Sequence, residues 1–290
     1  CCSLQLDACV SKLAPAAHLL NSATLPLPLA ERKKNSHKGS YGHVLIIGGG
    51  PGMPGAISLA AKAAMRTGAG AVTVATWPEH AKSALPLIPE AMISAVKTAN
   101  DLMSLLARAT VCVIGPGLGE SEWALNLFLT AITSQLPMVI DASALRLLSE
   151  HAQLDDNWIL TPHPGEAACL LSSSTDLIQK DRYQAAANIQ QQYGGVVVLK
   201  GAGTVIQTAE KDTFVCPRGN PAMASAGMGD VLSGIIAGLC AQGFSLADAA
   251  QCGVWAHAVA GDQVAKKLGG TGLLASDLFD VLPHILNYSE

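Results

Sequence analysis

Short, unbroken runs of apolar and β-branched residues recur along this chain, and nearly every run ends in glycine or a polar side chain. The runs cover residues 44–47, 71–75, 111–114, 138–140, 158–160 and 196–199. Strands that are apolar on both sides belong to parallel sheets with both faces covered by helices. An Ala-rich helical stretch at 56–67 separates the first two runs, as right-handed βαβ units require. We therefore predict a three-layer α/β/α domain with a central, mostly parallel sheet.

Size and composition narrow the class of protein. The chain has 290 residues, enough for one large α/β domain. The net charge is −4 and aromatic residues make up 4%, which argues against nucleic-acid and membrane-surface partners. The cysteines show no paired spacing and no apolar run reaches the length of a membrane span. We expect a cytoplasmic protein.

The first 36 residues differ from the rest in pattern. Pro26, Pro28 and the polar run at 31–36 are typical of a linker. The α/β domain is predicted over residues 37–290. Because the chain begins with Cys1 instead of Met, we expect it to be part of a longer protein.

Glycine-rich or polar clusters follow nearly all the predicted strands. They are residues 48–55, 115–119, Asp141, 163–166, 200–204 and 227–230. Ligands of open α/β sheets bind outside the carboxyl ends of the strands. Six clusters at one edge exceed what turn chemistry requires, so we predict the functional site there.

The segment 219–230 is the most informative cluster. A loop of small residues leads into an apolar stretch with helical spacing, and Asp230 stands at the junction. The free N–H groups of a first helical turn bind anions. Asp230 is ambiguous by itself, because Asp is also a favoured N-cap. Beside an anion hole, a carboxylate can take the proton of a hydroxyl that receives a phosphoryl group.

The other polar residues each have a structural alternative. Asp141 suits a helix cap or a ligand, and Lys200 suits phosphate contact or simple solvation. His163 lies between two prolines, as a loop histidine or a ligand contact, while Glu166 suits a first helical turn equally well. The glycines at 48–55 lack both the Rossmann spacing and the Lys-Ser/Thr ending of a P-loop.

Five motifs together resemble those of a known family. They are Ser36-His37-Lys38-Gly39, Gly115-Pro116-Gly117-Leu118-Gly119, Thr161-Pro162-His163-Pro164-Gly165-Glu166-Ala167, Leu199-Lys200-Gly201-Ala202-Gly203-Thr204 and Gly227-Met228-Gly229-Asp230-Val231-Leu232-Ser233-Gly234. This set resembles the ADP-dependent NAD(P)H-hydrate dehydratase family, which belongs to the ribokinase-like superfamily. The resemblance extends from about residue 36 to a last helix expected at 278–286.

The resemblance implies a repair reaction on hydrated NADH and NADPH, in which water has added across the nicotinamide ring. A nucleotide phosphorylates the ring hydroxyl of the S-epimer, and phosphate then leaves to restore the double bond. Bacterial members typically use ADP and eukaryotic members ATP, with Mg²⁺. The family also implies a homo-oligomer, often a tetramer, and an upstream epimerase domain, of which residues 1–14 would be the tail.

The resemblance also assigns roles by motif position. Asp230 would be the base, with Gly227, Met228 and Gly229 forming the N–H hole for the phosphoryl group. Residues assigned to the hydrated dinucleotide are Ala56, Gly119, His163 and Asp230. Residues assigned to the nucleotide are Lys200, Gly201, Ala202, Gly203, Thr204 and Gly229. Glu166 would lie near Mg²⁺, acting through water, and Asn220 is a further candidate for phosphate or a monovalent cation.

Two other functions fit some of these residues. A small-molecule kinase of the same superfamily, such as a hydroxyethylthiazole-type kinase, shares the glycine-Asp hole but stops at the phosphorylated product. A non-catalytic nucleotide-binding protein is the second alternative. His163 within its His-Pro-Gly-Glu motif and the Gly-rich loop at 115–119 favour the dehydratase. The sequence does not distinguish ADP from ATP, or NADH hydrate from NADPH hydrate.

Overall fold

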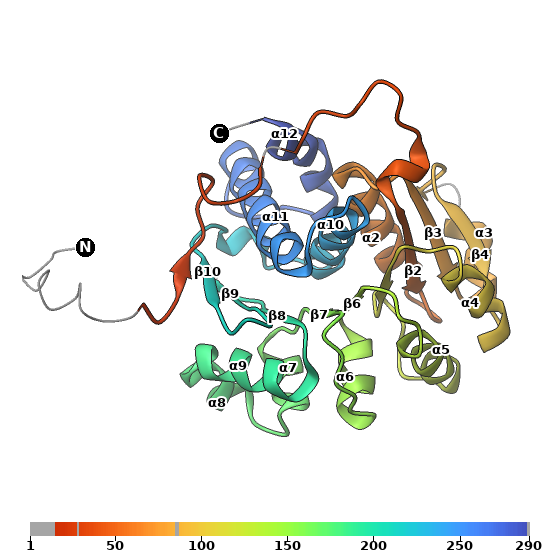
Figure 1. The fold of residues 1–290 in the computed structure, drawn as a ribbon, viewed down its shortest axis with the longest axis horizontal. Coiled ribbons are helices and arrows are strands. Elements are labelled where there is room, and N and C mark those ends of the chain that lie inside the picture. Colours follow the sequence, from red (N-terminus) through yellow and green to blue (C-terminus); the bar gives the residue numbers. More distant parts are fainter. Residues whose placement is uncertain (1–14, 28, 85–86, 289–290) are drawn as a thin grey trace, which may run out of the picture.

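A computed structural model describes residues 15–27, 29–84 and 87–288 of the chain. Within these ranges ten strands form one sheet in the order β1-β10-β9-β8-β7-β6-β5-β2-β3-β4. Helices cover both faces of this sheet (Figure 1). The predicted three-layer α/β/α architecture is therefore confirmed. No helix in the described ranges is long and apolar enough to cross a membrane.

The six predicted runs all form strands of the central sheet. They are β2 (His43–Gly48), β3 (Ala71–Thr76), β5 (Val111–Ile114), β6 (Met138–Ile140), β7 (Trp158–Leu160) and β8 (Val196–Leu199). They pair with one another in parallel. Their carboxyl ends consequently meet at one edge of the sheet, which is where the sequence places its polar clusters.

Four further strands lie outside the predicted set. They are β1 (His18–Leu19), β4 (Met92–Ala95), β9 (Thr204–Gln207) and β10 (Thr213–Cys216). β9 pairs antiparallel with both β8 and β10, and β4 is an edge strand with largely exposed side chains. The apolar runs of β9 and β10 are short, since β9 contributes only Val205 and Ile206 and β10 only residues 214–216, and neither run is among the six predicted as strands.

The two faces of the sheet carry different helices. One face is covered by α2 (Pro54–Thr67), α10 (Met228–Ala241), α11 (Leu246–Leu268), η5 (Ala275–Asp280) and α12 (Leu282–Asn287). The other face is covered by α4 (Ala99–Leu106), α5 (Glu122–Ile132), α6 (Ser143–Glu150), α7 (Pro164–Leu170), α8 (Thr175–Lys180) and α9 (Arg182–Tyr193). Shorter elements are η1 (Lys38–Tyr41), η2 (Pro78–His80), α3 (Ala81–Ala84) and η4 (Pro221–Met223). Successive residues of each central strand enter opposite cores, since side chains alternate along a strand.

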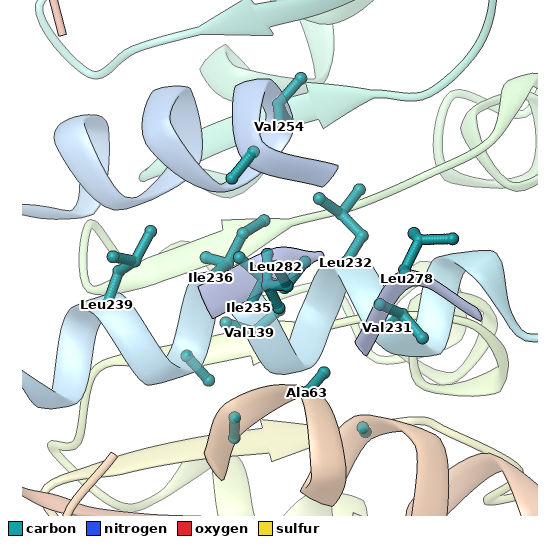
Figure 2. Packing of buried hydrophobic residues seen from close by; sticks show 14 of the residues in the cluster. Ala63, Val139, Val231, Leu232, Ile235, Ile236, Leu239, Val254, Leu278 and Leu282 are labelled. Atoms are coloured by element: carbon teal, nitrogen blue, oxygen red, sulfur yellow. The ribbon is translucent and has the colours of Figure 1, made fainter. Parts of the chain in front are cut away.

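Helix α10 carries the glycine-Asp segment and is buried between α2 and α11. Ile235 and Ile236 lie in its middle, with Ala63 of α2 on one side (Figure 2). A Cβ atom at Gly234 would lie 2.2 Å from the carbonyl oxygen of Ala60. Glycine on α10 and alanine on α2 thus let the two helices approach closely, which holds the N-terminus of α10 at the polar edge of the sheet.

The two ends of the chain depart from the sequence-based expectation. The last helix, expected at 278–286, is instead divided into η5 and α12, with Pro283 in the first turn of α12. The expected tail of an upstream domain, residues 1–14, lies outside the described residues. Part of the expected linker packs on the domain, because β1 pairs with β10 and Leu20 and Leu25 are buried in the core.

Candidate active site

The N-terminus of α10 has the geometry of an anion-binding site. Gly227 is the N-cap and has a left-handed backbone with φ of 88°. A Cβ atom there would lie 2.4 Å from Cδ1 of Leu59, so the position requires glycine. Asp230 lies inside the first turn, and the alternative that it is the N-cap is therefore wrong. The first N–H groups of a helix have no partner within it and are available to a ligand.

A buried ion pair lies next to this turn. The Nζ atom of Lys200, at the end of β8, is 2.8 Å from Oδ1 of Asp141, at the end of β6. The hydroxyl of Ser233 on α10 donates to Oδ2 of Asp141 at 2.8 Å. Asp141 is thus neither a helix cap nor exposed, since the N-cap of α6 is Ala142. Lys200 is correspondingly not simply solvated, and its Nζ also lies 3.7 Å from Oε2 of Glu166.

The pair holds both of its members in their charged forms. Burial alone would raise the pKa of Asp141, but the Lys200 charge and hydrogen bonds from Lys200, Ser233 and Thr161 outweigh it and lower that pKa. Burial would lower the pKa of Lys200, yet the charges of Asp141 and Glu166 raise it. A charged ion pair therefore lies beside the first turn of α10 at neutral pH.

Asp230 has the opposite behaviour. Burial, followed by repulsion from the Asp141 and Glu166 carboxylates, raises the pKa of Asp230 to about 7, although Lys200 partly offsets this rise. A carboxyl group with such a pKa exchanges its proton near neutral pH. That property suits a general base, and strongly perturbed groups beside a cleft are candidate catalytic residues.

His163 and Glu166 form a reciprocal cap at the start of α7. The backbone N–H of His163 donates to Oε2 of Glu166 at 2.7 Å, and the N–H of Glu166 donates to Nδ1 of His163 at 3.1 Å. His163 thus has a structural role as the N-cap of α7, and Glu166 has one in the first turn of that helix. Glu166 nevertheless joins the Lys200 group, and the His163 side chain remains 56% exposed at the site's edge. In the described ranges, no group of three or more His, Cys, Asp or Glu side chains is arranged to hold a metal ion.

A cavity of about 620 Å³ opens on one side of the α10 N-terminus. Its walls come from the turn between β8 and β9, the loop around η4, and the facing sides of α10 and α11. Predicted nucleotide-binding residues in the lining are Lys200, Gly201, Ala202, Gly203, Thr204 and Gly229. The volume is typical of a small-molecule site.

The residues expected to contact the dinucleotide do not line this cavity. Ala56 is in the first turn of α2, and Gly119 follows β5, the neighbour of β2 in the sheet. Gly119 donates its N–H to the Ser143 hydroxyl at 3.1 Å, just beyond Asp141. Gly227 abuts α2 through Leu59, whereas a Cβ atom on Gly229 would lie 3.3 Å from Nζ of Lys200. Asp230 follows these two glycines in the first turn of α10.

Some functional candidates are not evident from the sequence. Ser233 bonds to Asp141, but a serine in an apolar helix gives no signal of this role. His257 of α11 lines the cavity. Burial lowers the pKa of His257 to about 4, and its ring donates to the carbonyl of Met228. Its Nε2 atom is buried without a partner in the described part of the chain, and is an acceptor in this neutral ring.

Asn220 lines the cavity with both ends of its amide already engaged. Its Nδ2 donates to Oδ1 of Asp262 at 2.9 Å, and its Oδ1 accepts from the N–H of Ala222 at 3.1 Å. The amide still has one N–H donor and one lone pair of its oxygen for a phosphate or a cation. The amide shapes the loop in this structure.

The mostly parallel sheet, the glycine-capped helix N-terminus and the acidic residue beside it define a ribokinase-like α/β protein. Sequence comparison is consistent with that class. The family model described as NAD(P)H-hydrate dehydratase matches residues 44–284. The chain belongs to the NAD(P)H-hydrate dehydratase family.

Relatives agree with this assignment. The chain is 53% identical over 259 residues to a bifunctional NAD(P)H-hydrate repair enzyme Nnr of Coxiella burnetii, covering 89% of this chain and 53% of the relative. The chain thus spans about half the length of such bifunctional relatives. It is 36% identical to an ADP-dependent (S)-NAD(P)H-hydrate dehydratase of Neisseria meningitidis, covering 90% of each.

A solved structure also matches. It is an ADP/ATP-dependent NAD(P)H-hydrate dehydratase of Bacillus subtilis, co-crystallised with ATP and Mg²⁺. The TM-score is 0.83 at 30% identity, covering 94% of this chain and 98% of the neighbour.

Proposed function

We propose that this chain dehydrates the S-epimer of hydrated NADH and NADPH, with ADP as the phosphoryl donor. The observation that carries the proposal is the position of Asp230 in the first turn of α10, with a pKa of about 7, next to a cavity lined by the β8–β9 turn. The ADP-dependent Neisseria relative, similar over nearly its whole length, supports the choice of nucleotide.

In the proposed reaction, Asp230 takes the proton of the ring hydroxyl. The hydroxyl oxygen attacks the terminal phosphorus, and the bond from that phosphorus to the rest of the nucleotide breaks, releasing AMP from ADP. The N–H groups of residues 227–229 stabilise the charge on the transferred group. The ring C–O bond then breaks and phosphate departs with its electron pair. The neighbouring ring carbon loses the proton that hydration had added, and the electrons of that C–H bond form the restored double bond. Phosphorylation matters because hydroxide is a poor leaving group and phosphate a good one.

The remaining residues are assigned either to the hydrated dinucleotide or to the nucleotide. Ala56, Gly119 and His163 contact the hydrated dinucleotide. The nucleotide lies in the cavity against Gly229 and the β8–β9 turn, residues 200–204, and Lys200 reaches its phosphates from the ion pair with Asp141.

Mg²⁺ fits this arrangement only as part of the nucleotide complex. Both oxygens of Glu166 face His163 or Lys200, and a contact with the ion through water leaves these interactions in place. Mg²⁺ usually keeps several waters and binds through phosphates and one or two carboxylates. We therefore place Glu166 near the ion through water, where the ion would screen the charge of the nucleotide phosphates.

A single assay separates the dehydratase from its alternatives. Enzyme, hydrated NADH and ADP should restore the absorbance of NADH and release free phosphate, and a parallel reaction with ATP tests nucleotide choice. A stable phosphorylated product without NADH recovery would favour a kinase. Nucleotide binding with neither product would favour a non-catalytic protein.

Three broader expectations belong to the same proposal. They are a homotetramer, a cytoplasmic location, and an upstream epimerase domain joined through residues 1–36. The bifunctional names of relatives about twice as long support the last of these. Size-exclusion chromatography with light scattering tests the tetramer.

A further inference from the structure

Arg182, the first residue of α9, donates hydrogen bonds to the backbone of the β8–β9 turn. Its Nη1 atom donates to the carbonyl oxygens of Ala202 at 2.7 Å and Gly203 at 3.0 Å. Its Nη2 atom donates to the carbonyl oxygens of Leu199 at 2.9 Å and Lys200 at 3.3 Å. One planar guanidinium therefore binds four carbonyl groups within five consecutive residues.

These bonds constrain how the turn faces the cavity. Gly201 and Gly203 have φ of 146° and 67°, a backbone that other residues rarely adopt. A Cβ atom at Gly201 would lie 3.0 Å from Nη2 of Arg182, so the turn and the guanidinium are in direct contact. With four carbonyl groups directed at Arg182, the turn is fixed in the shape that lines the cavity.

The charge of Arg182 forms no ion pair with a carboxylate of the described residues, although the side chain is half-buried. Its Nε atom is also buried without a partner in the same part of the chain. Among the described residues the guanidinium contacts carbonyl dipoles, so its positive charge adds to the potential on the cavity side of the turn. Such a potential attracts phosphate groups.

We propose that Arg182 is a positioning residue for the nucleotide, acting through the β8–β9 turn. It makes the turn rigid and electropositive without touching the nucleotide itself. The inference rests on the proposed nucleotide site. It adds a residue that lies outside the motifs and the cavity lining.

The planar guanidinium of arginine carries several N–H donors, and a lysine at position 182 could not make the same hydrogen bonds. An ammonium group is a compact donor that cannot bridge four carbonyl groups spread along a turn. Arg182→Lys should keep the charge and lose the geometry, whereas Arg182→Met should lose both. Comparing the two variants separates rigidity from electrostatic attraction.

The test is ADP binding by calorimetry together with steady-state kinetics. Arg182→Lys should raise both the Kd for ADP and its KM by about 10-fold, and Arg182→Met by about 100-fold. The KM for hydrated NADH should stay within about threefold. Arg146→Met is the matched control, because exposed Arg146 pairs only with exposed Glu120 and Glu150 among the described residues. It should change neither constant.

Three outcomes would overturn the proposal. An unchanged ADP affinity in a folded variant with a lower Tm would make Arg182 merely structural. Equal changes in the KM for ADP and the KM for hydrated NADH would also make Arg182 merely structural. Wild-type affinity in Arg182→Lys would show that charge alone is sufficient. If wild-type protein binds ADP but repairs no hydrate, the proposed function fails while the Arg182 binding test still applies.

Discussion

Replacing Asp230 with Asn removes a carboxyl group whose ionised form is disfavoured in the folded protein. The pKa of Asp230 rises from an ordinary value of 3.8 to about 7, because the group is buried and faces Asp141 and Glu166. Between these two pH values the folded state holds a proton that the unfolded state has released. Stability should therefore fall as the pH rises through this window. Asn is neutral throughout and avoids the loss.

The magnitude follows from the size of the rise. One pKa unit corresponds to about 1.4 kcal/mol, so ionised Asp230 costs the folded state up to about 4 kcal/mol above neutral pH. Partial exposure of the carboxyl group makes this an upper value. Asp230→Asn should thus be more stable than the wild type by about 2–4 kcal/mol at about pH 9, and nearly equal to it at about pH 4. Turnover should fall by at least about 100-fold, because the base is lost.

Urea unfolding at both pH values measures the stability difference, and the hydrate-repair assay measures turnover. Asp176→Asn is a suitable control, since Asp176 is an exposed acidic residue in the first turn of α8. It should gain no stability at high pH. If Asp230→Asn gains none either, the argument from burial and carboxylate repulsion is refuted. Normal turnover in Asp230→Asn would refute its role as the base.

Three further predictions concern the same site. The wild-type kcat/KM should rise with pH, reach half its plateau value at about pH 7 and level off above about pH 8, as Asp230 ionises. A flat profile across this range would contradict the role of Asp230 as the base. Lys200→Met leaves Asp141 buried without its cation, so the free energy of unfolding in urea should fall by roughly 3–5 kcal/mol. The pH profile of kcat/KM should also shift to higher pH, and an unmoved profile would argue against Lys200 acting on Asp230. Gly227→Ala would place a Cβ atom 2.4 Å from Leu59 at a φ of 88°, which should lower the free energy of unfolding by roughly 1–3 kcal/mol and weaken ADP binding in calorimetry. Wild-type stability and ADP affinity would show that the turn adapts to the added methyl group.

The candidate site was predictable wherever its residues follow strands of the parallel sheet. Asp141, Lys200 and the segment 163–166 each follow a run of apolar residues, and the topology brings their ends to one edge. Ser233 and His257 lie inside apolar helices instead. Their contacts arise only when α10 and α11 pack at this edge, so no local pattern marks them.

The sequence by itself determined the layered α/β architecture and the edge that carries the site. Apolar runs and glycine-rich ends are local signals, and they specify strands, helices and the side of the sheet where ligands bind. It also determined that an acidic residue stands at the start of α10.

Only the tertiary structure decided the states of the acidic residues. Asp141, Glu166 and Asp230 come from three different elements and share one ammonium group, that of Lys200. Lys200 lies closest to Asp141 and holds it ionised, while Asp230 is left to repulsion and burial. A pKa depends on distances and solvent exclusion between residues far apart in the chain. The sequence carries no local signal for these distances, and they give Asp230 the raised pKa on which its proposed role as the base rests.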